Sequence, residues 1–162
     1  GVARGLGLTA LIAGTNDLAA ELRCRPGAER TPLLPVLSQI VVAARAASAV
    51  ALDGVMNALG DPARLVAECA QGAAMGFDGK TLIHPGQIEA ANRAFGPDDA
   101  AIERARRIVA AFAGAPDRGA IRLDGEMVER LHLAAAERVL RVVSLASSGE
   151  KALSVAKAGE GQ

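Results

Sequence analysis

Polar residues that could do chemistry follow three short apolar runs of this sequence, each at the point where a run ends. Thr15-Asn16-Asp17 follows the first run, Asp53-Gly54 the second and His84-Pro85 the third. If the runs are parallel strands joined by helices, their carboxyl ends share one edge of a sheet, and functional loops of such sheets lie there. Carboxylates in that position could reach a metal ion. The order of these residues therefore predicts one site built from three loops.

Asp17 is the strongest of these candidates, and its chemistry supports two interpretations. A carboxylate just past a buried parallel strand can reach a Mg²⁺ ion held by oxygen ligands, with water and substrate completing the octahedron. An Asp at the start of a short helix also commonly caps that helix. The residue alone does not decide between the two.

Three further candidates have a structural interpretation beside the functional one. Asp53 belongs to an Asp-Gly pair, which is primarily turn chemistry. Lys80 lies inside the third run, where a lysine usually reaches a solvated edge, although in a barrel it could face inward and hold an anion. His84 precedes a proline, which fixes it in an extended or turn geometry. No Ser or Cys nucleophile is obviously paired with this histidine.

Apolar periodicity predicts alternating strands and helices in the first half of the chain. Residues 8–13 and 49–52 are short apolar runs typical of buried strands. Between them, residues 34–48 carry apolar side chains at helical spacing. Residues 17–22 could form a short helical turn, and residues 23–32 have no period and are expected to be a loop.

A third strand is expected after a helix with clear boundaries. Asp61-Pro62 is typical of a helix start, with a capping side chain and a proline at the first helical position. Gly76 is expected to end that helix, and the strand should occupy about residues 78–83. The alternation predicts parallel βα units, that is, an α/β fold.

The remaining residues change in character. Pro97-Asp98-Asp99 is expected to open an amphipathic helix, and residues 114–119 are a Gly/Pro/Asp linker. Residues 120–125 are expected to form a strand that enters a turn. A last helix should begin at about Arg130, and the Ser/Gly/Ala/Lys-rich tail of residues 147–162 is expected to be disordered.

Two segments carry a resemblance to a known family. Gly76-Phe77-Asp78-Gly79-Lys80-Thr81-Leu82-Ile83-His84-Pro85, with Gln87-Ile88 after it, resembles the last barrel strand of the citrate lyase β-subunit-like and malyl-CoA lyase family, within the HpcH/HpaI aldolase superfamily. Gly14-Thr15-Asn16-Asp17-Leu18 is similar to the Gly-x-x-Asp-Leu segment of that family. The resemblance covers about residues 5–145.

The resemblance implies a domain organisation. Residues 1–113 would be about three βα units from the C-terminal half of a TIM (β/α)8 barrel, and residues 114–146 a C-terminal extension that contacts a neighbouring subunit. The first five strands of the family barrel have no counterpart here, nor do the Arg that grips the substrate and the Glu that is the other protein ligand of Mg²⁺. We therefore expect a piece of a barrel, and the absence of an initiator Met is consistent with a fragment.

The resemblance also implies roles for the strand-end residues. It makes Asp17 a Mg²⁺ ligand and places Asp53 near the substrate at the barrel mouth. Four further residues would shape the site around the coenzyme A thioester, namely Lys80, His84, Pro85 and Gln87.

The segment of residues 123–129 resembles the family's Asp-Gly-Lys-Met-x-Asp element, in an extension that lends its acid to the active site of a neighbouring subunit. Glu129 occupies the position of the catalytic Asp, and Asp124, at the family's turn, is the candidate substitute. The extra methylene of Glu matters because a misplacement of about 1 Å can cost on the order of a hundredfold in rate. Without the resemblance, a Glu before a helix is most often only favourable for the helix dipole.

The resemblance implies an enzyme, a Mg²⁺-dependent carbon–carbon lyase. It would split a 3-hydroxyacyl-CoA of the malyl-CoA or citryl-CoA type into acetyl-CoA and a keto acid. Mg²⁺ would polarise the carbonyl of the keto acid, and a carboxylate would move the proton at the thioester α-carbon. Some relatives hydrolyse the acyl-CoA instead, so a (3S)-malyl-CoA thioesterase is an alternative. The complete form is expected to be a cytoplasmic homo-oligomer, a trimer or hexamer.

Composition argues against some partners. Eighteen basic and eighteen acidic residues give a formal net charge of zero, which argues against nucleic acid or an acidic membrane surface. The sequence contains no run of 18 or more uncharged apolar residues, so a membrane span is not expected. Two cysteines, Cys24 and Cys69, are too few for a disulfide framework. They are expected to be reduced, as cysteines of cytosolic proteins are. Besides an enzyme, the sequence is compatible with a truncated, non-catalytic half-barrel or with a small α/β domain that happens to share loop motifs.

Overall fold

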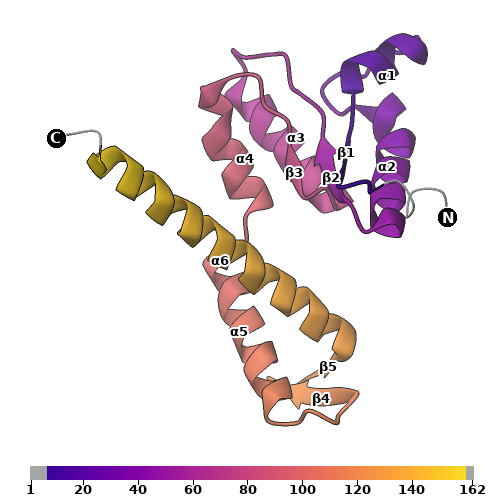
Figure 1. The fold of residues 1–162 in the computed structure, drawn as a ribbon. Helices are drawn as coiled ribbons and strands as arrows, with labels where there is room; N and C mark the ends of the chain where they lie inside the picture. The colour runs from indigo at the N-terminus through magenta and orange to yellow at the C-terminus, as the bar shows by residue number, and fades with distance from the viewer. Residues whose placement is uncertain (1–6, 160–162) are drawn as a thin grey trace. The chain divides into compact units, whose positions relative to one another are not determined.

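The chain forms two compact units, residues 1–96 and residues 97–162. The computed structural model describes the backbone of residues 7–159 and the side chains of residues 7–145. Figure 1 shows the elements of both units, and each unit is described by itself below.

The first unit is built on a parallel sheet whose strands follow the order of the chain. The strands are β1 (Ala10–Ile12), β2 (Val50–Asp53) and β3 (Gly79–Lys80), in the order β1-β2-β3. Ala10 pairs with Val50, and Asp53 pairs with Lys80. Sequential parallel strands joined by helices are the arrangement of a (β/α)8 barrel segment. The predicted α/β fold is thus confirmed.

Within residues 7–96, four α-helices and two short 3₁₀ helices complete the first unit. The helices are α1 (Thr15–Glu21), α2 (Leu34–Ala47), α3 (Pro62–Met75) and α4 (Ile88–Phe95), with η2 (Thr31–Leu33) and η3 (Pro85–Gln87) between them. The predicted boundaries of α3 are confirmed, because the Asp61 carboxylate accepts a hydrogen bond of 3.0 Å from the backbone N–H of Arg64. Gly76, with φ of 95°, ends that helix in the left-handed conformation that glycine adopts without strain.

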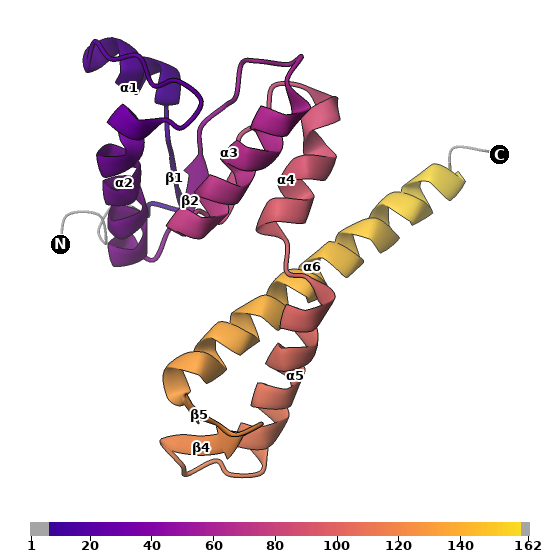
Figure 2. The same ribbon diagram turned by 180° about the vertical axis from the view of Figure 1, so that it is seen from behind.

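Helices cover one face of the sheet. Ala51 of β2 is fully buried in a core with Leu37 and Ala44 of α2. Ile12 and Val50 are 59% and 44% exposed, whereas their neighbours Leu11 and Ala51, on the opposite face of the sheet, pack in the core. Figure 2 shows α2 and α3 beside the strands from behind. The other face of the sheet is therefore left uncovered by the described residues of the first unit.

The third strand is shorter than the sequence predicts. It spans Gly79–Lys80 rather than residues 78–83. The backbone N–H of Thr81 still donates to the carbonyl oxygen of Asp53, at 3.0 Å. The chain then leaves the sheet because the His-Pro pair directs it into η3 and α4, a helix that the sequence analysis did not identify.

The second unit is a hairpin packed on two helices. Its elements are α5 (Asp99–Ala113), β4 (Ala120–Leu123), β5 (Glu126–Glu129) and α6 (Arg130–Gly159). Ile108 and Phe112 of α5, Val128 of β5 and Ala136 of α6 form its buried core. Because α5 packs in this core, the structure divides the chain at Gly96, whereas the sequence analysis placed the end of the barrel segment at residue 113.

The last helix continues further than composition suggests. Its backbone is helical through Gly159, where the sequence analysis expected a disordered tail from residue 147. Ala and Leu are frequent in α6, and both have high helix propensity. Residues 160–162 of the expected tail lie outside the described residues.

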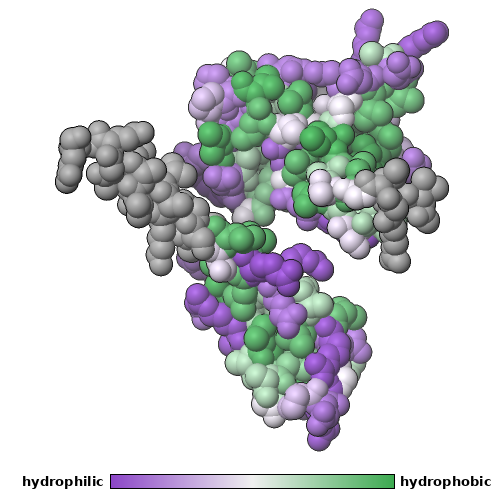
Figure 3. All heavy atoms as spheres, in the orientation of Figure 1, coloured by the Kyte–Doolittle hydropathy of each residue, from purple (hydrophilic) through white to green (hydrophobic). Residues whose placement is uncertain are grey.

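Apolar side chains reach the surface of both units. Figure 3 shows green apolar atoms among purple hydrophilic ones on the visible face of each unit. Among the most exposed of the larger apolar side chains are Val42 in the first unit and Met127 in the second, at 68% and 71% exposure. Within the described residues, no helix is long and apolar enough to cross a membrane.

Candidate functional site

The segments predicted to meet at one edge of the sheet do follow the carboxyl ends of the three strands. Asn57, after β2, donates from its side chain to the Asn16 side-chain oxygen after β1, at 2.8 Å. The Thr15 hydroxyl donates to the carbonyl oxygen of Val55, at 3.4 Å. These contacts hold the first two loops together at the edge where a barrel presents its functional residues.

Gly54 is required for this close approach. A Cβ at this position would lie 2.4 Å from the Thr15 hydroxyl oxygen and 2.6 Å from the carbonyl oxygen of Ala13. The Asp-Gly pair at the end of β2 therefore brings the β1 loop against the β2 loop, and any larger residue would push the two apart.

Asp17 lies at this edge in the first turn of α1, and its side chain is exposed. The N-cap position of α1 is Gly14, and no side chain makes a capping hydrogen bond. The capping interpretation of Asp17 is thus not what the structure shows. One carboxylate oxygen of Asp17 lies 3.0 Å from the place where a Cβ of Gly14 would be, so a side chain at residue 14 would press on the carboxylate.

The described residues offer a ligand for Mg²⁺ but do not form a complete metal site by themselves. They include no group of three or more His, Cys, Asp or Glu residues that could hold a metal ion. Mg²⁺ is usually bound in proteins through one or two carboxylates, with water and substrate oxygens as further ligands. The exposed Asp17 carboxylate fits one such ligand.

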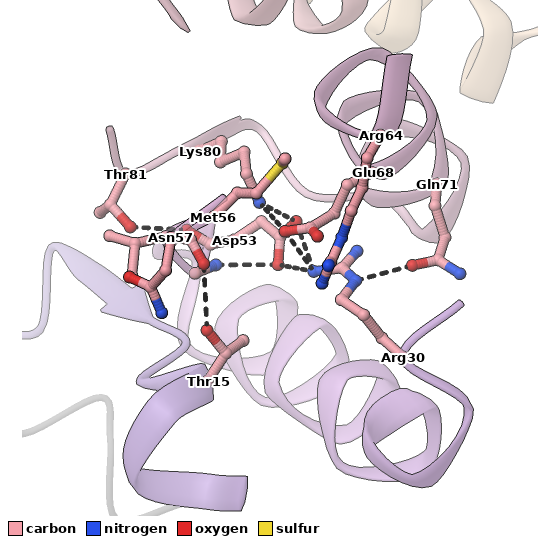
Figure 4. A network of polar contacts seen from close by, with 12 residues as sticks. Thr15, Arg30, Asp53, Met56, Asn57, Arg64, Glu68, Gln71, Lys80 and Thr81 are labelled. Atoms are coloured by element: carbon pink, nitrogen blue, oxygen red, sulfur yellow. Dashed lines mark hydrogen bonds and ion pairs between the residues drawn. The ribbon is translucent and has the colours of Figure 1, made fainter. Parts of the chain in front are cut away.

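Asp53 is not exposed at the loop edge but fully buried. Its two carboxylate oxygens accept hydrogen bonds from Nη1 of Arg30, at 2.8 and 2.9 Å. Lys80 donates to Asp53 at 3.1 Å, and the backbone N–H of Gly54 donates at 2.8 Å. Figure 4 shows these contacts. The structure therefore gives Asp53 the role of an anchor for the end of β2.

Lys80 takes neither orientation considered from the sequence. Its side chain is fully buried and donates to Glu68 of α3 at 2.7 Å. Asp53 and Lys80 are register partners and face the same side of the sheet, the side covered by α3, because a Cβ at Gly72 of that helix would lie 2.8 Å from the Asp53 carboxylate. The lysine therefore points between sheet and helix, away from a barrel interior.

Two members of this buried ion cluster were missed by sequence analysis. Arg30 lies in the segment that the sequence analysis assigned to a loop, where no periodic pattern indicates which side chains are buried. Its backbone is left-handed, with φ of 54°. Glu68 does carry a signal. With Leu65, Cys69 and Gly72 it shares the buried face of α3, and an acid at core spacing requires a buried cation.

Cys69 lies beside this ion cluster and is buried. Burial raises the pKa of its thiol, with Glu68 and Asp53 adding to the rise and Lys80 and Arg30 opposing it. The thiol is therefore protonated and unreactive under conditions where an exposed cysteine begins to ionise.

The loop after β3 has an exposed part and a buried part. His84 and Pro85 are exposed, and Nδ1 of His84 accepts a hydrogen bond from the backbone N–H of Gly86 at 3.0 Å. Gln87 is buried, and its side-chain oxygen accepts from the N–H of Ile83 while its nitrogen donates to the carbonyl oxygen of Met56, both at 3.0 Å. Gln87 thus ties the loop after β3 to the loop after β2.

The two acidic candidates of the second unit differ in their surroundings. Asp124 and Gly125, with φ of 52° and 88°, form the two-residue turn of the β4–β5 hairpin, and the Asp124 carboxylate pairs with Arg107 at 2.9 Å. Glu129 ends β5 and is half-buried, and its backbone N–H donates to Nδ1 of His132 at 2.9 Å. Among the described residues no ion pair involves the Glu129 carboxylate. His132 had not been singled out from the sequence.

The parallel βα units and the loops at the carboxyl ends of their strands are those of part of a (β/α)8 barrel. The chain belongs to the HpcH/HpaI aldolase/citrate lyase family, whose pattern matches residues 2–85. This confirms the resemblance noted in the sequence.

Several named relatives are similar over most of this chain. A (3S)-malyl-CoA thioesterase of Cereibacter sphaeroides is 47% identical over 135 residues, which are 82% of this chain and 47% of the relative. A citrate lyase subunit beta-like protein of Deinococcus radiodurans is 40% identical, over 78% of this chain and 45% of the relative. The human mitochondrial citramalyl-CoA lyase is 34% identical, over 89% of this chain and 42% of the length of the human protein. The chain thus spans about half the length of the curated relatives that it matches.

Solved structures give the same result. The protein CitE from Mycobacterium tuberculosis, in complex with magnesium, acetoacetate and coenzyme A, superposes with a TM-score of 0.69 at 34% identity, over 86% of this chain and 54% of CitE. A citrate lyase from Burkholderia xenovorans superposes with a TM-score of 0.72 at 26% identity, over 90% of this chain and 48% of the other.

Proposed function

We propose that this chain supplies one Mg²⁺ ligand and the surrounding loops of an enzyme that acts on a short hydroxyacyl-CoA, and that the reaction is carbon–carbon cleavage of the malyl-CoA or citryl-CoA type. The observation that carries the proposal is the exposed Asp17 carboxylate, in the first turn of the helix that follows β1. The magnesium in the related CitE complex supports it.

Each residue has a task in this proposal. Asp17 would hold Mg²⁺, and the bound ion would act as a Lewis acid on a carbonyl oxygen of the substrate. His84 and Pro85 are the exposed residues of the β3 loop and would contact the coenzyme A thioester, while Lys80, Gln87 and Asp53 fix that loop and its neighbour from beneath. These last three act by position because their polar atoms are engaged within the protein.

Glu129 is the acid that we assign to proton transfer at the thioester α-carbon, in the active site of a neighbouring subunit of a cytoplasmic homo-oligomer. Its carboxylate takes part in no ion pair among the described residues and could accept a proton. Asp124 is a weaker candidate for this step because its backbone forms the hairpin turn and its carboxylate pairs with Arg107.

Thioester hydrolysis is the second candidate, and a specific observation favours it. The (3S)-malyl-CoA thioesterase is 47% identical to this chain. In hydrolysis, water adds to the thioester carbonyl and the carbon–sulfur bond breaks, which gives malate and free coenzyme A. In cleavage, the bond between the α- and β-carbons breaks, which gives acetyl-CoA and glyoxylate.

A chimera separates these reactions. This chain would replace the matching segment of the Cereibacter sphaeroides relative, and the purified chimera would receive malyl-CoA and Mg²⁺. Glyoxylate and acetyl-CoA support the lyase, whereas a free thiol and malate support the thioesterase. A folded chimera that forms neither product supports the hypothesis of a non-catalytic half-barrel.

Asp17→Asn in the active chimera tests the metal assignment. Replacing the proposed metal-binding carboxylate should lower the rate by about a hundredfold or more, since several kcal/mol of charge stabilisation would go with the ion. Asp99→Asn is the matched control, because Asp99 is also an exposed acid in the first turn of a helix. Equal activity of the two variants would remove Asp17 from the site.

A further inference from the structure

Glu129, the acid assigned to proton transfer, lies where strand β5 ends and helix α6 begins, as Figure 1 shows. Side chains alternate between the two faces along a strand. Val128, the residue before Glu129, is buried in the core of the second unit, and Met127, two residues before it, is 71% exposed. The hairpin therefore presents Glu129 on its outer face, together with Met127.

The backbone N–H of Glu129 points away from the other strand of the hairpin. Ala120 is the register partner of Glu129, and just outside this pair the N–H of Arg130 donates to the carbonyl oxygen of Gly119 at 3.2 Å. A ladder bond in that place marks the pair as the kind that exchanges no hydrogen bonds of its own. The described sheet has no strand beyond β5, so the N–H of Glu129 needs an acceptor from elsewhere.

His132 supplies that acceptor. Its Nδ1 accepts from the N–H of Glu129 at 2.9 Å. His132 is the third residue of α6, the position from which a side chain commonly reaches back to the N–H of the residue before a helix. A ring nitrogen that accepts carries no proton, so the imidazole is neutral, with its proton on Nε2. The backbone at Glu129 is thus held from both sides, by the ladder and by the imidazole.

The place of this backbone determines the place of the acid. Proton transfer requires the carboxylate within hydrogen-bond reach of the proton that it moves, and a misplacement of about 1 Å can cost on the order of a hundredfold in rate. Among the described residues no ion pair holds the Glu129 carboxylate, so its place follows from the backbone that carries it. Anchoring the N–H of Glu129 therefore restricts where its carboxylate can go.

We propose that His132 is a positioning residue for the reaction, whose neutral imidazole fixes the backbone of Glu129 and so sets its carboxylate for the proton at the thioester α-carbon. The inference rests on the proposed function, because only a catalytic Glu129 gives this anchor a task in turnover. A His132 with a structural role alone would do no more than start helix α6. The two roles differ in what a substitution of His132 does to kcat.

The hydrogen bond itself is tested first, by NMR of the full 162-residue chain labelled with ¹⁵N. Since both bonded atoms are nitrogens, we expect a scalar coupling across the bond between the amide nitrogen of Glu129 and Nδ1 of His132. The chain has one other histidine, His84, so the ring signals are few. A proton on Nδ1 of His132 in the neutral imidazole, or the absence of the coupling, overturns the proposal.

Two variants at residue 132 test the anchoring in the same chain. His132→Ala removes the acceptor, whereas His132→Gln keeps one, because Gln commonly makes this bond at the third residue of a helix. His132→Ala should lower the ¹⁵N order parameter of the Glu129 amide, and His132→Gln should keep it. Asp98→Ala is the matched control, since it removes the bond that caps α5, from the N–H of Ala101 at 2.7 Å. A Glu129 amide that stays equally ordered in His132→Ala contradicts the anchor.

The active chimera tests the link to turnover. His132→Ala should lower kcat by about tenfold or more with KM little changed, since the anchor places the acid and not the substrate. His132→Gln should restore most of kcat. If kcat is unchanged in His132→Ala, or falls as far in Asp98→Ala, His132 has a structural role alone and the proposal is overturned.

Glu129→Gln separates this failure from a failure of the proposed function. If that variant keeps its turnover, Glu129 is not the acid, and the assignment of His132 falls with it even where the coupling is observed. If Glu129→Gln loses turnover while His132→Ala keeps it, the proposed function stands and only the role of His132 is overturned. An inactive chimera counts against the proposed function, whereas the NMR coupling still decides whether His132 holds Glu129.

Discussion

At the residue scale, four buried charges hold the ends of two strands against one helix. Asp53 of β2 and Lys80 of β3 meet Glu68 of α3 and Arg30 within 2.7 to 3.7 Å. The loops of the proposed active site begin one or two residues beyond these anchors. The ion cluster therefore sets where the loops start.

Removing one charge from this cluster should destabilise the first unit strongly. Lys80→Met leaves the buried carboxylates of Asp53 and Glu68 with one cation less, and breaking a buried pair typically costs about 3–5 kcal/mol. The free energy of unfolding in urea measures the loss. Arg93→Met, which breaks an exposed pair, should cost about 0–1 kcal/mol, and a similar loss in both variants would contradict the role of Lys80 as an anchor.

Cys69 should make stability fall in alkali. Burial raises the pKa of its thiol in the folded chain, so above about pH 8.5, the ordinary pKa of a cysteine, the unfolded chain releases a proton that the folded chain keeps. The unfolded state then binds fewer protons, and the free energy of unfolding decreases as pH rises.

The measurement for Cys69 is urea unfolding at several pH values, and Cys69→Ala should remove part of the alkaline slope. A thiol reagent should modify the partly exposed Cys24 first and Cys69 only after unfolding. Rapid modification of both thiols in the folded chain would show that Cys69 is accessible.

At the scale of elements, local signals in the sequence predicted where helices begin, whereas long-range contacts determine where the side chains at the strand ends point. Asp61 and Asp98 cap helices because each accepts from an N–H only three residues away. The orientation of Lys80 depends on Asp53, 27 residues earlier, and on a helix packed over the sheet. Such a contact leaves no periodic pattern, which is why Lys80 was predicted as a ligand-binding residue and Arg30 was missed.

The β4–β5 hairpin allows the two interpretations of Asp124 to be separated. Asp124 has φ of 52°, and a left-handed backbone costs Ala about 1–2 kcal/mol, whereas Asn tolerates it. Asp124→Ala should therefore lower stability by about 1 kcal/mol and Asp124→Asn by much less, as measured by thermal unfolding. In the active chimera, Asp124→Asn should keep its turnover. A loss of turnover in this stable variant would return Asp124 to the catalytic residues.

At the scale of the whole molecule, the chain holds three consecutive βα units of a family barrel, and it spans about half the length of its curated relatives. Sequence motifs identified this family because the strand-end segments are local and specific. Within the first unit, the described residues leave one face of the sheet uncovered, with Ile12 and Val50 exposed on strands whose other face packs against the core. Exposed apolar sheet surface favours association with another chain.

The 162-residue chain should therefore self-associate through this face. Ile12→Lys and Val50→Lys place a charge on it, and burying an unpaired charge in a contact costs several kcal/mol, so each variant should shift the chain toward monomer in sedimentation velocity. Val42→Lys is the control because Val42 is 68% exposed but lies on α2. If Val42→Lys dissociates the chain as well as the strand variants do, association uses the helical surface, and the uncovered sheet face does not drive it.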